Sequence, residues 1–163
     1  MEYNYDSAIG KFKRIAVVRL GANSDLKLGI EAFCNENQIT SGVILFAFGS
    51  IKDVRYCNAM RAPEVKAGYA YSDPPLIING GMELIGLNGT ISKNKEGIIE
   101  THIHFSMSDQ YGNGHGGHLV EGTKVLITAE ILIAELEDIE MTKKYHSDFD
   151  LYLSTPVQVN KTV

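Results

Sequence analysis

The segment that most constrains the fold runs from Glu100 to Gly122, where an alternating strand pattern leads into a glycine-rich reversal of the chain. Alternation with a period of two predicts a β-strand whose two faces differ in character. The apolar face carries Thr101, Ile103, Phe105 and Met107, and the polar face carries Glu100, His102, His104, Ser106 and Ser108. Four glycines then lie between Gly112 and Gly117, and they let the chain turn back and re-enter the sheet.

Most of the remaining chain also has strand character, with apolar and β-branched runs separated by turn residues. We expect strands at 12–20, 43–48, 81–90 and 123–135, a hairpin turn at 93–97 and a short edge strand near 69–71. The run at 43–48 is continuously apolar, which predicts a strand buried on both faces. Beyond residue 135 we expect either a terminal strand or a segment packed along the sheet edge.

One helix is expected near the N-terminus. Ser24 or Asp25 offers an N-cap, and apolar residues recur with helical spacing from Leu26 to Cys34. We expect this helix to end near Gln38. Strands with one clear helix predict a single α+β domain built on a mixed or antiparallel sheet. We divide the chain into an N-terminal arm at 1–12, this domain at 13–155 and a frayed C-terminal tail at 156–163.

Composition excludes some functions. The formal net charge is −5 and the basic residues are not clustered, so we do not expect unaided binding to nucleic acid. Cys34 and Cys57 are the two cysteines, and we interpret them as buried free thiols in a reducing environment. The N-terminal residues carry no apolar targeting segment, and no apolar run is long enough to span a membrane. We therefore expect a cytoplasmic protein.

His102 and His104 form half of a candidate metal site, because residues two apart on a strand are separated by about 6.6 Å and point to the same side. A third ligand must come from the returning chain, which supplies His115 and His118. We favour His118, which follows the last glycines, and keep His115 as an extra ligand. Three neutral imidazoles with an open fourth position suit Zn²⁺, while Ni²⁺, Fe²⁺ and Cu²⁺ stay open.

Several carboxylates accompany these histidines. Glu100, Asp109 and Glu121 are candidates to fix the orientation of the imidazole rings by hydrogen bonding. Glu130 lies in the middle of the apolar run at 123–135, where a buried carboxylate needs a partner. We interpret Glu130 as a structural carboxylate satisfied by a neighbouring histidine, by Arg19 or by a subunit contact.

These motifs resemble the PPC domain, the "plants and prokaryotes conserved" domain also called DUF296 and related to PD1-like DNA-binding proteins. The similarity covers roughly residues 13–137. Its most specific parts are the pattern H-x-H-x-S-x-S at 102–108, G-G-H-L at 116–119 and T-A-E at 128–130. The segments R-L-G-A-N-S-D-L at 19–26 and G-M-E-L-I-G-L-N-G at 81–89 also resemble the family, although Met82 stands where the family usually has a basic residue.

The resemblance implies an α+β fold with a curved, mainly antiparallel sheet and one principal helix, assembled as a homotrimer. Relatives of the stand-alone prokaryotic type place the residues that match His102, His104 and His118 close together, in an arrangement suited to a metal. Plant members carry an AT-hook that binds A·T-rich DNA, and this chain has no R-G-R-P hook. Direct binding to DNA is therefore not expected.

Three functions remain open. We favour a trimeric metal-binding module, with zinc as the expected ion and a small molecule or a protein as a further partner. The first alternative is a DNA-associated regulatory or scaffold protein of the PD1-like kind. The second is a metal-dependent enzyme acting on a small molecule, in which Glu83 or Glu130 would move protons. A cupin is disfavoured because the second cupin motif is absent from the sequence.

Overall fold

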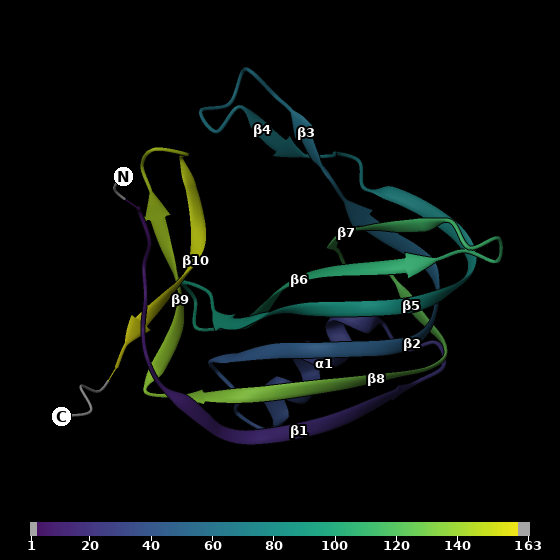
Figure 1. The fold of residues 1–163 in the computed structure, drawn as a ribbon, viewed down its shortest axis with the longest axis horizontal. Coiled ribbons are helices and arrows are strands. Elements are labelled where there is room, and N and C mark those ends of the chain that lie inside the picture. Colours follow the sequence, from purple (N-terminus) through teal and green to yellow (C-terminus); the bar gives the residue numbers. More distant parts are fainter. Residues whose placement is uncertain (1–2, 160–163) are drawn as a thin grey trace.

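The structure is a computed structural model that describes residues 3–159, and most of these residues lie in long strands (Figure 1). The elements in chain order are β1 (Lys11–Gly21), α1 (Leu26–Glu36), β2 (Gly42–Cys57), β3 (Ala59–Arg61), β4 (Tyr69–Tyr71), β5 (Leu76–Lys93), β6 (Ile99–Ser108), β7 (Gly114–Leu119), β8 (Lys124–Glu137), β9 (Ile139–His146) and β10 (Leu151–Gln158). The predicted strands and helix are all present. The sequence patterns did not predict β3, β9 and β10 as separate strands.

Six strands form one antiparallel sheet in the order β1-β8-β2-β5-β6-β7. The end of β2 also pairs with β7, through Tyr56 with Leu119 and Cys57 with His118. The strand β7 therefore bridges β6 and β2, and it closes one end of the curved sheet. This closure fixes where the returning histidine segment lies relative to β6.

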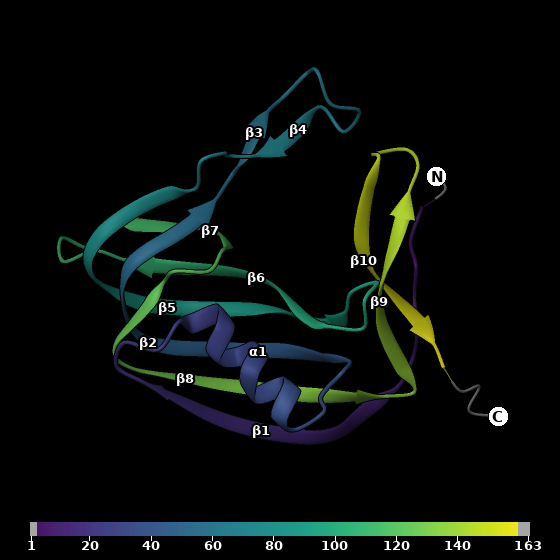
Figure 2. The same ribbon diagram turned by 180° about the vertical axis from the view of Figure 1, so that it is seen from behind.

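Helix α1 packs across one face of the sheet (Figure 2). Asp25, one of the two predicted candidates, is its N-cap, and its carboxylate accepts a hydrogen bond from the backbone N–H of Leu28. Leu26, Ile30 and Cys34 are fully buried on the side that faces the sheet. Within the described residues, no helix is long and apolar enough to cross a membrane.

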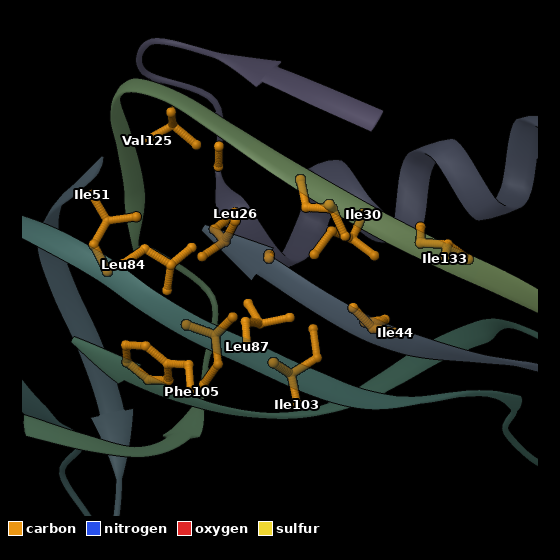
Figure 3. Packing of buried hydrophobic residues seen from close by; sticks show 14 of the residues in the cluster. Leu26, Ile30, Ile44, Ile51, Leu84, Leu87, Ile103, Phe105, Val125 and Ile133 are labelled. Carbon is orange, nitrogen blue, oxygen red and sulfur yellow. The ribbon is translucent and has the colours of Figure 1, made fainter. Parts of the chain in front are cut away.

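The core lies between α1 and this face of the sheet (Figure 3). Strands in the middle of the sheet contribute fully buried side chains, among them Ile44, Ile103, Ile131 and Ile133. Burial of each such side chain contributes roughly 1.5–3 kcal/mol to folding. The same packing holds β6 with its apolar face against the core and its polar face turned away.

The other face of the sheet is open, which corrects the expectation for 43–48. Ile44 and Ala47 are buried, but Phe46 and Phe48 keep 47% and 49% of their surface exposed. The single helix covers one face, so the other apolar side chains of this run have no layer above them. Exposed apolar side chains on β1, β5 and β8 include Val17, Ile85 and Ile127.

Two hairpins extend from the sheet, β3–β4 and β9–β10 (Figure 1). The strand β10 continues to Gln158, so the first residues of the expected frayed tail are paired with β9. Pro156 is tolerated there because β10 pairs on one side only. The Gln158 side chain binds both the N–H and the carbonyl of Ile9, which holds the N-terminal arm beside the hairpin. Residues 160–163 of the tail lie outside the described residues.

Gly89 on β5 allows β6 to approach closely. A Cβ atom there would lie 2.3 Å from the carbonyl oxygen of His102 and 3.0 Å from the Cα of Ile103. We expect Gly89→Ala to lower the free energy of unfolding by about 1–3 kcal/mol, because the strand pair must shift. Urea unfolding measures this change.

The matched control is Gly114→Ala on β7, because a Cβ atom at Gly114 would meet nothing within 4 Å. That variant should differ from the original protein by less than about 0.5 kcal/mol. Equal stabilities of the two alanine variants would contradict the close-approach argument.

Candidate metal centre

The strand β6 presents His102 and His104 on the face turned away from the core. Ile103, Phe105 and Met107 alternate with them and are buried. This anchoring holds the strand in register, because a shift of one residue would bury the histidines and expose the core residues. His102 is partly buried and His104 is exposed.

The strand β7 brings His118 back to the same place. His118 lies opposite His104 of β6 and opposite Cys57 of β2. The preceding Gly117 permits this double pairing, because a Cβ there would lie 2.5 Å from the Asn58 side-chain oxygen and 2.7 Å from the Cys57 carbonyl oxygen. The glycine before His118 in G-G-H-L therefore lets β7 approach the end of β2 closely.

The three histidines form one cluster, and their candidate ligand atoms all lie within 4.8 Å of one another. The Nε2 atoms of His102 and His104 are 3.1 Å apart. Two nitrogens bound to one tetrahedral Zn²⁺ at 2.0–2.1 Å are separated by about 3.3 Å, so this spacing fits two ligands of one ion. His115 lies outside the cluster.

One buried nitrogen in the cluster has no partner in the described part of the chain. It is Nδ1 of His118, which is buried without a hydrogen bond. A buried polar atom without a partner costs free energy, and coordination of a metal ion is one way to satisfy an imidazole nitrogen. The donor set of the cluster therefore fits a transition metal.

The surroundings favour the neutral form of His118 and His102. Burial, followed by the charges of His102, His104, Lys27 and Lys143 in that order, lowers the pKa of His118 to about 4. Burial also lowers the pKa of His102, with a contribution from His104. Neutral imidazoles have free lone pairs at neutral pH, which is the form that binds metal.

Tyr71 of β4 packs on the cluster. Its ring stacks on the imidazole of His118, with ring centres 4.5 Å apart and an angle of 22° between the planes. Burial raises the pKa of the Tyr71 hydroxyl. The short edge strand predicted near 69–71 therefore forms part of the site, which its sequence pattern did not indicate.

Glu31 of α1 supports the strand that carries the histidines, and no local sequence pattern indicates this role. Its Oε1 atom accepts hydrogen bonds from the backbone N–H of Thr101 at 2.9 Å and from the Thr101 hydroxyl at 2.8 Å. The strand β7 pairs with β6 only from His104 onward, so Glu31 takes the place of a neighbouring strand at Thr101. Lys27 also binds this oxygen, at 2.5 Å.

The carboxylates expected to orient the histidines have other partners. Glu100 accepts a hydrogen bond from Asn94 in the turn before β6. Asp109 accepts hydrogen bonds from the backbone and side chain of Asn113, and it lies 3.8 Å from His115. Glu121 is exposed. None of these three belongs to the histidine cluster found among the described residues.

Glu83 and Glu130 also lie away from the cluster. Glu130 is on β8, and β2 and β5 lie between that strand and β6. Three strand spacings amount to about 14 Å, which is too far for a side chain to share a proton with an ion at the histidines. Glu130 faces Arg19 and Phe48 across the sheet, and it is partly exposed rather than buried. Glu83 pairs with Ser108, four residues beyond His104.

The fold and the histidine arrangement define a small α+β domain with a three-histidine cluster at its open sheet face. The family model of the Plants and Prokaryotes Conserved (PCC) domain matches residues 7–137, and the chain belongs to this family. The resemblance inferred from the sequence motifs is thereby confirmed.

Solved structures agree with the fold. A plant- and prokaryote-conserved protein from Pyrococcus horikoshii has a TM-score of 0.76 at 25% identity, covering 94% of this chain and 99% of that one. A metal-containing protein from Archaeoglobus fulgidus has a TM-score of 0.74 at 20% identity, covering 91% and 97%. A hypothetical protein from Salmonella has a TM-score of 0.73 at 24% identity, covering 98% and 100%. The predicted α+β class with a mainly antiparallel sheet is confirmed.

Among curated proteins, the chain is 28% identical over 122 residues to the bifunctional protein GlmU of Synechococcus sp. strain JA-3-3Ab. The alignment covers 75% of this chain and 17% of that protein. A second GlmU, from strain JA-2-3B'a(2-13), is 24% identical over 80% of this chain and 18% of its own length. The chain thus spans less than a fifth of the length of these relatives.

We expect Glu31→Ala to lower the free energy of unfolding by about 1–3 kcal/mol, because the N–H and hydroxyl of Thr101 lose their acceptor. Glu31→Gln keeps an acceptor oxygen and should lose less. Urea unfolding of the metal-free protein measures both changes. Glu36→Ala, an exposed glutamate on the same helix, is the control and should change stability by less than about 0.5 kcal/mol. A Glu31→Ala protein as stable as this control would refute the supporting role.

Proposed function

We propose that this protein is a metal-binding module that holds one divalent transition metal ion, with zinc as the expected ion, through His102, His104 and His118. The observation that carries the proposal is the convergence of three imidazoles at 4.8 Å or less, with a buried Nδ1 that lacks a partner among the described residues. The solved metal-containing protein from Archaeoglobus fulgidus is 20% identical to this chain and bears on the fold alone, so the assignment rests on the geometry of the histidines.

In this proposal the histidines bind the ion and Tyr71 shields one of them. The histidines supply neutral nitrogen ligands, and three such ligands leave a coordination position for water or another molecule. Tyr71 limits the access of water to His118 by stacking on its ring. A bound zinc ion would supply Lewis acidity at the open position. No carboxylate among the described residues lies in the cluster to act as a base, so we propose binding rather than catalysis.

The test is zinc binding by the purified protein after removal of metal and reconstitution. We expect one Zn²⁺ per chain, and we expect His102→Ala, His104→Ala and His118→Ala each to weaken zinc binding by at least about 100-fold. Isothermal titration calorimetry with elemental analysis measures both quantities. His115→Ala is the matched control, because it removes a nearby histidine outside the cluster. No zinc uptake by the original protein, or equal loss in the control, would refute the site.

The protein is further proposed to assemble as a homotrimer through the open face of the sheet. Val17 and Phe46 both lie opposite Leu132, and Phe48 stacks near Phe46 with ring centres 6.2 Å apart. An apolar patch that spans three strands is typical of a subunit interface. In a trimer, other subunits would cover Phe46 and Phe48, which no helix of the described residues covers.

We expect Phe48→Asp to disrupt the trimer, because a carboxylate would be buried in an apolar contact. Sedimentation velocity should show trimers for the original protein and monomers for this variant. Ile98→Asp, at an exposed site in the turn before β6, is the control and should stay trimeric. A monomeric original protein would refute the assembly.

A DNA-associated role is the second candidate, because two solved neighbours, from Bacteroides thetaiotaomicron and Ralstonia eutropha, are described as candidate DNA-binding proteins. Their identities to this chain are 22% and 14%, so they bear on the fold alone. The net charge of −5 opposes contact with phosphates unless a partner protein supplies the basic surface.

A further inference from the structure

A cavity of about 910 Å³ lies directly beside the histidine cluster, and His102 and His118 form part of its wall. The β3–β4 hairpin and the β9–β10 hairpin line it from two sides, and both extend from the sheet near β6 (Figures 1 and 2). The hairpins are tied together where Lys66 donates to the Ser147 carbonyl at 2.6 Å. Sites for small ligands commonly enclose about 300–1,000 Å³, so this cavity is large enough to hold one.

Lys143 of β9 brings a positive charge into this cavity. Its Nζ donates to the Ser154 hydroxyl at 3.0 Å, and no carboxylate of the described residues lies within ion-pair distance of it. Lys143 is partly buried, and its charge is close enough to lower the pKa values of His102 and His118. A partly buried ammonium beside an electropositive metal site is an arrangement that attracts an anion.

The remaining wall is mainly apolar and aromatic. Tyr71 stacks on His118, and Phe149, Leu151 and Tyr152 of the second hairpin line the opposite side while keeping nearly half of their surface exposed. Aromatic side chains that gather around one cavity favour a flat apolar molecule, which can stack between them.

The acidic residues of the cavity limit the charge of the ligand. Glu64, Glu100 and Asp150 also line it. Glu100 is held by Asn94, and Asp150 accepts a hydrogen bond from the Tyr145 hydroxyl at 2.6 Å. Besides Lys143, the cavity is lined by one more lysine, Lys66, whose Nζ is engaged by the Ser147 carbonyl, so three carboxylates face two lysines and a second negative charge on the ligand would add to a surplus of negative charge. The cavity therefore suits a ligand with one negative charge, located at the end that the histidines line.

We propose that this cavity binds a small monocarboxylate with a flat apolar body, whose carboxylate lies between the histidine-held metal and Lys143. The proposal rests on the metal-binding function proposed above. A carboxylate suits both partners, since its oxygens coordinate zinc-like ions and also accept hydrogen bonds from an ammonium. The aromatic side chains of the two hairpins hold the apolar body.

The test uses Co²⁺ as a spectroscopic substitute for zinc, with benzoate as the probe in chloride-free buffer. Metal uptake is measured first, by elemental analysis and by the visible bands of bound Co²⁺. Benzoate should then shift these bands with a saturating dependence on concentration. Acetate should bind at least about fivefold more weakly because it lacks the apolar body, and uncharged benzamide should cause no shift.

Lys143→Met should weaken benzoate binding by about tenfold or more while leaving Co²⁺ uptake intact. The control is Lys144→Met, because Lys144 is the exposed neighbour on β9 and lies outside the cavity lining. That variant should bind benzoate within about twofold of the original protein. Circular dichroism confirms that both variants are folded, and Lys143→Gln repeats the test if Lys143→Met does not fold.

The outcomes separate the two proposals. Failure of Co²⁺ and zinc to bind refutes the metal centre before any ligand is added. Normal metal uptake with no spectral response to benzoate, or with equal benzoate affinity in both lysine variants, refutes the carboxylate site and leaves the metal centre standing. Tighter binding of inorganic phosphate than of benzoate would also overturn the proposed ligand class.

Discussion

The double pairing of β7 is the interaction on which the candidate site depends. This short strand pairs with β6 through His104 and with the end of β2 through Cys57, and His118 is the residue that faces both. Backbone hydrogen bonds of two ladders therefore fix the third histidine with no need for a dedicated loop. Gly117 makes the approach sterically possible.

The chain covers one face of its sheet with α1 and leaves the other face open. The covered face holds the core, while the open face carries the histidines at one end and an apolar patch on the strands beside them. This division separates the core from the candidate metal centre, because the residues that alternate with the histidines pack in the core and keep β6 in register. Glu31 adds a link from the helix to the strand just before His102.

Local patterns predicted much of this arrangement. The period-two alternation of β6 places His102 and His104 on one face, the helix start offers Ser24 or Asp25 as N-cap, and the place after the glycines favours His118 over His115. The patterns failed for Phe46 and Phe48, because an apolar run does not reveal which faces of a strand other elements cover. They also overlooked Tyr71 and Glu31, whose roles come from segments distant in the chain.

The sequence by itself determined the helix and most of the sheet strands, the face on which two histidines lie and the membership of a protein family, because these follow from periodicity, capping and motif spacing. Only the tertiary structure decided that His118 joins the cluster, that Glu83 and Glu130 stay outside it, and that Lys143 shares a cavity with the histidines. The physical reason is that strand order and hairpin placement bring together residues tens of positions apart, and local propensities carry no information about such long-range pairing.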